Sequence, residues 1–172
     1  MKYLFLAVTF LLLLCSCQSE KKVSEKNEYL RWVGDIEKNE QTDRPDFELC
    51  NGEDHILQYF NFGNGPVYSG EKLELINLFN SKYIPVTKKS ESGLIRIRFV
   101  VNCKGKAGRF RVIQSDENYQ EKEFDPDLIN QLVDITKGIE NWEILDRDGF
   151  TIDYYMYLVF KMKEGKITEI LP

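Results

Sequence analysis

His55 is the only histidine of the chain and the first residue to consider for catalysis, because imidazole can exchange protons near neutral pH. It lies in the polar stretch 51–55, where Glu53 or Asp54 could orient the ring. Catalysis would also need a nucleophile within reach, and no nucleophile motif occurs in the sequence. We therefore interpret His55 as an ordinary surface histidine, and we expect no catalytic residue, no enzyme activity and no cofactor.

Cys50 and Cys103 are the cysteines that remain once the two near the N-terminus are set apart. Two cysteines and one histidine lack the close spacing of a zinc site, so we expect no metal. In an exported protein, an even residual pair favours a disulfide between Cys50 and Cys103. Two separately buried thiols are the alternative, because sequence alone does not give their geometry.

A group of basic and aromatic residues is the strongest candidate for ligand binding. Strand alternation places six side chains on one face of a predicted sheet, which we call the Arg/Tyr face: Arg96, Arg98, Arg109, Arg111, Tyr155 and Tyr157. Arg98 should lie opposite Arg111, and because like charges destabilise a sheet, Asp153 or an anionic partner should offset them. Exposed tyrosine beside arginine is typical of recognition surfaces. The alternatives are a solvated face neutralised by local acids and a face covered by residues 29–69.

The N-terminus has the pattern of an export signal. After Lys2, the apolar run 3–14 would span roughly 18 Å as a helix, which is shorter than the roughly 30 Å hydrocarbon core of a membrane. The run ends on residues 14–17, Leu-Cys-Ser-Cys, which resemble the bacterial lipobox with a small residue at −1. We predict a signal peptide over residues 1–16 and lipid attachment at Cys17. An ordinary secretory signal with incidental cysteines is the alternative.

The rest of the chain divides into a tether, an extension and a folded domain. Residues 17–28 are polar, charged and aperiodic, which indicates a flexible lipidated tether. Residues 29–69 are interpreted as an irregular extension packed on a domain that spans 70–172. Loss of Lys2 with the leader would change the net charge from −5 to −6, and a negative balance argues against a nucleic-acid partner.

The domain has clear helical and strand periodicities. They predict a helix, two strands, a helix and two more strands over residues 71–82, 94–103, 106–115, 126–137, 151–163 and 166–171. The first helix would start from Ser69 and bury Leu73, Ile76 and Phe79. Since a helix joins the second and third strands, these should both be antiparallel neighbours of the first. The expected fold is an α+β antiparallel sheet in the order second–first–third strand, with the C-terminal strand at the edge and both helices on one face.

Residues 71–163 resemble the C-terminal domain of the TonB family, a periplasmic α+β domain of the TonB/TolA type. The resemblance rests on the alternating hairpin strand, the capped helix and the aromatic that follows it: Gly93, Ile95, Ile97, Phe99, Val101, Gly105, Val112, Ser115, Asp125 and Trp142. In this family, an extended peptide ligand adds a strand beside the third strand. Here the chain continues through a short turn into 166–171, which we expect to fill that edge.

Other features depart from the TonB pattern. The predicted signal is cleaved rather than retained as a membrane helix, and the chain has no proline-rich spacer. The Tyr-Pro pair of the family is split by Ile84, and Ile144 replaces the proline that usually follows the tryptophan. We therefore do not expect TonB-type energy transduction.

These observations predict an envelope lipoprotein that acts as a non-catalytic protein-interaction module. Its lipid would hold it in the membrane, and its partner would be an envelope protein of unknown identity. The alternative is a binder of an anionic glycan or peptide through the Arg/Tyr face. Gln18 after Cys17 favours delivery to the outer membrane, by analogy with lipoprotein sorting. The single acid within 19–21 favours a periplasm-facing domain over a surface-exposed one.

Overall fold

The computed structural model describes residues 34–59, 68–86, 88, 90–140 and 142–171. The predicted signal peptide, Cys17 and the predicted tether lie outside these residues. Within the described part of the chain, no helix combines the length and apolar character needed to cross a membrane.

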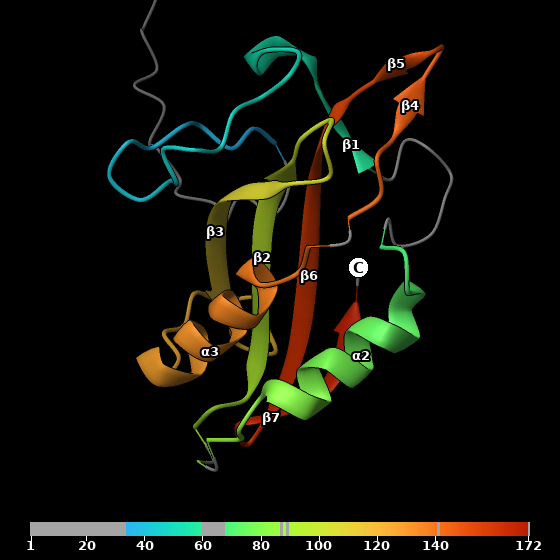
Figure 1. Ribbon diagram of the computed structural model, residues 1–172. Coiled ribbons are helices and arrows are strands. Elements are labelled where there is room, and N and C mark those ends of the chain that lie inside the picture. The colour runs from blue at the N-terminus through green and yellow to red at the C-terminus, as the bar shows by residue number, and fades with distance from the viewer. Residues whose placement is uncertain (1–33, 60–67, 87, 89, 141, 172) are drawn as a thin grey trace, which may run out of the picture.

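A five-stranded sheet forms the centre of the fold (Figure 1). Its strands are β1 (Ile56–Gln58), β2 (Gly93–Val101), β3 (Ala107–Ser115), β6 (Asp153–Lys163) and β7 (Lys166–Leu171). β2 lies between β3 and β6 and is antiparallel to both. The alternating apolar residues of β2 point into the main core, where Ile95, Ile97 and Phe99 are fully buried.

The outer edge of β6 carries two further strands. β1 pairs in parallel with Asp153–Tyr155, and β7 pairs antiparallel with the stretch from Val159 to Lys163. The mixed α+β class expected from the sequence is confirmed. The sheet differs in detail from the expected one, because a strand from the supposedly irregular extension shares this edge with the C-terminal strand.

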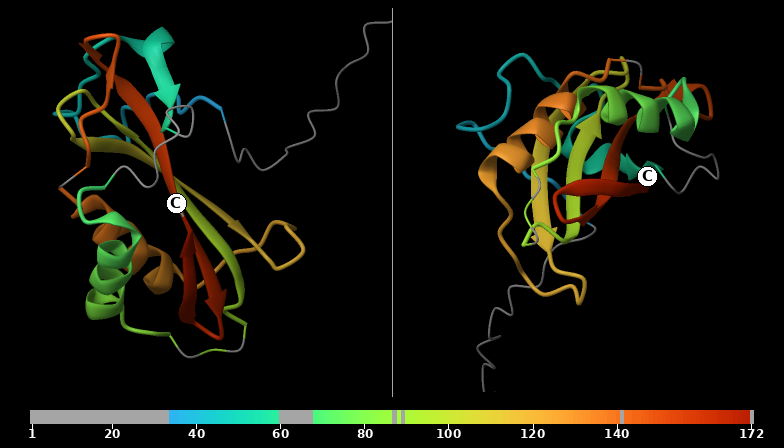
Figure 2. Two further views of the ribbon diagram at one scale, coloured as in Figure 1. Left: turned by 90° about the vertical axis from the view of Figure 1, so that its right-hand side faces the viewer. Right: turned by 90° about the horizontal axis from the view of Figure 1, so that it is seen from below.

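Two helices, α2 (Glu71–Lys82) and α3 (Pro126–Lys137), lie on the same side of the sheet (Figure 2). α3 starts from Asp125, whose side chain accepts a hydrogen bond from the Asp127 N–H. In contrast, α2 follows Gly70 and has no side-chain cap, so the expected cap at Ser69 is wrong.

The apolar stripe of α2 also differs from the prediction. Leu75 and Phe79, four residues apart, face the sheet, and the Phe79 ring packs edge-on against Phe160 at 4.8 Å between centroids. Leu73 points away and is 68% exposed. Of the expected stripe, Phe79 is buried and Ile76 packs partly buried against the core, whereas Leu73 is wrong and Leu75 takes its place.

Residues 34–55, which include the 3-10 helix η1 (Glu53–His55), pack against the sheet around a second, smaller core. Ile36 packs there with Val100 and Tyr155, and Phe47 lies at its border. A Cβ atom on Gly108 would lie 2.3 Å from the Phe47 ring, so only glycine allows this close approach to β3. We call residues 34–55 the covering segment.

A small hairpin projects beyond the sheet (Figure 1). It consists of β4 (Asp146–Arg147) and β5 (Phe150–Thr151), joined by Asp148 and Gly149. Both turn residues have positive φ angles, 56° and 85°, as the tight turns of two-residue hairpins require. The expected strand 151–163 thus begins at residue 153, and a separate hairpin precedes it.

Candidate functional site

The Arg/Tyr face is covered by the chain itself. Arg96, Arg98 and Arg109 are only 7%, 5% and 4% exposed, and Tyr155 is also buried. Arg98 pairs directly with Arg111 across the β2–β3 ladder, as the sequence predicted. Of the alternatives left open by the sequence, coverage by the extension describes this face.

Arg109 reaches the covering segment because of a β-bulge. The register of β2 and β3 shifts between Arg98 and Val100, and Arg109 has a φ of 57° at this point. Its guanidinium donates to both carboxylate oxygens of Glu53, at 2.6 and 2.7 Å. This bidentate pair holds the pKa of Glu53 below its ordinary value.

The charge of Arg111 is offset in a similar way. Arg111 donates to both oxygens of Asp43, at 2.6 and 2.8 Å, and to the Glu37 carbonyl at 2.7 Å. The hydrogen bond from Arg111 is the main reason that the pKa of Asp43 lies below its usual value. Arg98 donates to the Gly34 carbonyl. Asp153, which we expected to offset these arginines, points elsewhere.

The aromatic members of the face make local contacts. The Arg96 guanidinium lies 3.8 Å from the centre of the Tyr157 ring, and Tyr157 meets Tyr59 edge-on at 5.3 Å. The Tyr155 hydroxyl donates to Asp35 at 3.4 Å. Residues 34–55 supply hydrogen-bond acceptors to Arg98, Arg109 and Arg111, so an anionic glycan or peptide would have to compete with them for these side chains.

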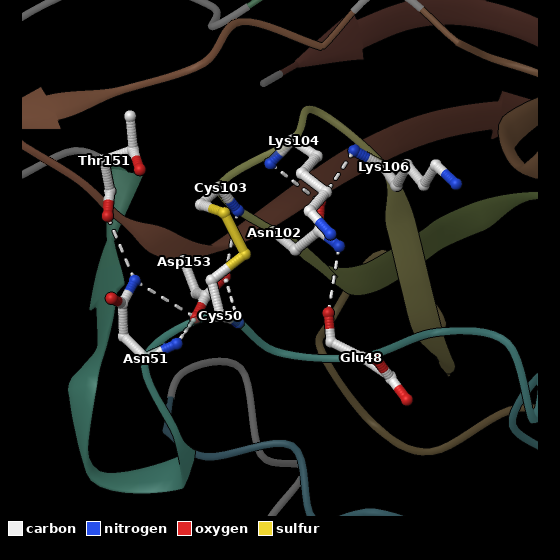
Figure 3. Close-up of a disulfide and its surroundings, with 9 residues drawn as sticks. All are labelled: Glu48, Cys50, Asn51, Asn102, Cys103, Lys104, Lys106, Thr151 and Asp153. Carbon is white, nitrogen blue, oxygen red and sulfur yellow. Dashed lines mark hydrogen bonds between the residues drawn. A yellow bond between two sulfur atoms is a disulfide. The ribbon is translucent and has the colours of Figure 1, made fainter.

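A disulfide and a buried carboxylate fix the covering segment to the sheet (Figure 3). The predicted Cys50–Cys103 bond is confirmed, with 5.9 Å between the two Cα atoms. Asp153 is fully buried and accepts hydrogen bonds from the backbone N–H groups of Cys50 and Cys103, both at 2.9 Å, and of Asn51 at 2.8 Å. One carboxylate thus joins the covering segment, the β2–β3 turn and the start of β6.

The side chains of Cys50, Cys103 and Asp153 form the only potential metal-ligand cluster among the described residues. Its two sulfurs are bonded to each other, and its carboxylate is occupied by backbone donors. This cluster therefore has a structural role. His55 lies exposed in η1 and is not a member of this cluster.

The most exposed large apolar side chain of the described residues is Phe150, at 74%. It stands on β5 of the projecting hairpin, between an aspartate-containing turn and the buried Ile152. Sequence reasoning missed this residue. The signal that could have found it is the Asp148–Gly149 pair, which is typical of a two-residue hairpin turn.

Comparison with known proteins identifies no related protein. No family model, no curated protein and no solved structure matches the chain. The resemblance to the TonB C-terminal domain therefore stays a prediction from the sequence motifs.

Proposed function

We propose that the protein is an envelope lipoprotein that acts as a non-catalytic protein-interaction module, with the β4–β5 hairpin as its principal contact. The observation that carries this proposal is Phe150, a large apolar side chain held in solvent at the end of a projecting element. A single exposed apolar residue is ordinary on a protein surface. On an element that both projects from the fold and is rigidly held, it supports a role as an anchor.

The hairpin is fixed at both its turn and its base. At the turn, the Asp146 carboxylate accepts a hydrogen bond from the Gly149 N–H at 2.9 Å. At the base, the Ile152 N–H donates to the Leu145 carbonyl at 3.0 Å. The Thr151 carbonyl accepts a further bond from the Asn51 side chain at 3.0 Å, which ties the hairpin to the disulfide region. Little conformational entropy is left to lose when Phe150 meets a partner.

The chemistry of the hairpin suggests the character of the partner. Burial of a phenylalanine contributes about 1.5–3 kcal/mol, so the partner should offer an apolar pocket. Asp146 and Asp148 precede Phe150 in the sequence and lie exposed on the hairpin with Arg147 between them, which leaves one net negative charge. A pocket with a basic rim would complement these charges. Membrane attachment through Cys17, outer-membrane location and a periplasm-facing domain complete the proposal and rest on the sequence signals.

Strand addition at β6, the mode implied by the TonB resemblance, is less suited to this chain. β1 and β7 already hydrogen-bond to most of that edge. An incoming peptide would have to displace one of them before it found unpaired backbone groups. This is the reason to place the contact on the hairpin and not on the sheet edge.

The test compares Phe150→Ser with Leu73→Ser, a matched control that removes an equally exposed side chain from α2. Full-length protein and both variants are used as bait in envelope extracts, and captured proteins are quantified by mass spectrometry. A candidate partner is then purified, and its affinity is measured against all three forms.

We expect Phe150→Ser to weaken binding roughly 10- to 150-fold, which is about 1.5–3 kcal/mol, and Leu73→Ser to change it less than about twofold. Unfolding midpoints should be unchanged in both variants because both side chains are exposed. Equal binding by the wild-type protein and Phe150→Ser would overturn the proposed contact.

A further inference from the structure

A depression of about 410 Å³ lies where three segments meet: residues 44–47, residues 104–107 and residues 137–140. Residues 44–47 belong to the covering segment, and residues 104–107 run through the β2–β3 turn into the start of β3. Residues 137–140 run from the last residue of α3 into the chain that follows it. The residues that line it combine apolar and charged side chains: Arg44, Asp46, Phe47, Lys104, Lys106, Ala107, Lys137, Ile139 and Glu140. This depression is separate from both the Arg/Tyr face and the projecting hairpin.

The charge in the depression is mainly positive. Arg44 is paired with Asp46 at 2.6 Å, so these two residues balance each other. Lys104, Lys106 and Lys137 have no carboxylate within 4.0 Å among the described residues. Three ammonium groups and the single remaining acid, Glu140, therefore give a local excess of positive charge on a chain whose net charge is −5.

Side-chain hydrogen bonds fix the turn that carries two of these lysines (Figure 3). The Asn102 side-chain oxygen accepts from the backbone N–H groups of Lys104 and Lys106, at 3.0 and 3.1 Å. The side-chain nitrogen of the same asparagine donates to the Glu48 carbonyl at 2.9 Å. The backbone of both lysines is thus held by one buried amide.

Covalent and steric contacts restrain the same turn further. Cys103, directly before Lys104, is bonded to Cys50 of the covering segment. Gly105 packs so closely on the chain after α3 that a Cβ atom there would lie 2.7 Å from the Trp142 carbonyl oxygen. The backbone that carries Lys104 and Lys106 is therefore preorganised, which lowers that part of the entropic cost of binding.

We propose that this depression binds the phosphate group of a phosphate ester. An ammonium is a compact charge with three donors that suits tetrahedral phosphate oxygens. The one arginine in the depression, whose planar fork could bind either phosphate or carboxylate, is occupied by Asp46, so the three lysines are left to bind the anion. Phe47 and Ile139 offer an apolar surface to the carbon part of the ester. The ester can come from a soluble metabolite or from a lipid headgroup.

The test uses the full-length ¹⁵N-labelled protein and two double variants. K104Q/K106Q removes two charges from the depression and leaves the backbone hydrogen bonds intact. K163Q/K166Q is the matched control, because it removes two exposed lysines from another Gly-containing turn, between β6 and β7. Glycerol phosphate is titrated into each protein, and backbone amide shifts are followed by NMR.

We expect saturable shifts at Gly105 and Lys137, an apparent Kd at least tenfold weaker in K104Q/K106Q, and less than a twofold change in the control. Vesicles of phosphatidylglycerol and of phosphatidylcholine distinguish the two sources of the ester. Lysine-dependent binding to anionic vesicles assigns a lipid headgroup, and lysine-dependent binding to glycerol phosphate alone assigns a soluble ester. Absence of saturation with both probes, or equal losses in the two double variants, would overturn the proposal.

Discussion

Removal of the Cys50–Cys103 bond should cost a large share of the stability of this protein. The bond joins residues that are 53 positions apart in the sequence. Closing a loop of that length reduces the entropy of the unfolded chain by an amount worth about 4 kcal/mol at 25 °C. Since whole domains are stable by only about 5–15 kcal/mol, the C50A/C103A variant should be marginally folded.

Urea unfolding followed by tryptophan fluorescence measures this effect. With a typical slope of about 1–3 kcal/mol per M, a loss of about 4 kcal/mol lowers the midpoint by roughly 1.3–4 M. Reduced wild-type protein should unfold at nearly the same urea concentration as C50A/C103A, and reductant should leave the variant unchanged. A loss below about 1 kcal/mol would refute the argument that the bond acts on the unfolded chain.

Three further predictions concern acid stability, the sheet edge and the lipid. Because Arg111 holds the pKa of Asp43 below its ordinary value, this ion pair stabilises the fold above about pH 4, and its contribution is lost as the pH falls further. The urea midpoints at pH 7 and pH 2.5 should therefore differ less in Asp43→Asn than in the wild-type protein. Equal differences in the two proteins would contradict this reasoning. A chain that ends after Lys163 lacks β7, so sedimentation should show self-association, or an extended peptide of the kind bound by TonB C-terminal domains should bind more tightly. An unchanged monomer with unchanged peptide affinity would show that β7 does not protect the edge. Cys17→Ala should abolish incorporation of a fatty-acid analogue, and retained label would exclude this residue as the lipid site.

Those parts of the fold that depend on local periodicity could be predicted from the sequence. The alternation in β2 places Ile95 and Ile97 in the core because successive strand residues point to opposite faces. The same rule and a turn at residues 104–105 predict the pairing of Arg98 with Arg111. Asp125 and the proline after it likewise define the start of α3.

The covering segment could not be predicted in the same way. Its contacts with the sheet are individual side-chain interactions, such as that of Arg111 with Asp43, which lie 68 residues apart. No periodicity encodes such a pair, and β1 has only three residues, which is too short for an alternating pattern. That the covering segment buries Arg98, Arg109 and Tyr155 therefore emerges only from the three-dimensional structure.

The β4–β5 hairpin was missed for a different reason. Each of its strands has two residues, so no alternation precedes or follows the turn. Asp148 and Gly149 were the only local signal, and a turn pair without flanking strands is a weak one. The exposure of Phe150 depends on how far this hairpin projects, which is a property of the fold.

Site-specific photo-crosslinking in cells tests the central claim most directly. A benzophenone amino acid is introduced at position 150 on the hairpin or at position 73 on α2, two sites with similar exposure. The account predicts a discrete adduct with one envelope protein from position 150 and none with that protein from position 73. The absence of an adduct at position 150, or the same adduct from both positions, would contradict the assignment of the hairpin as the interaction site.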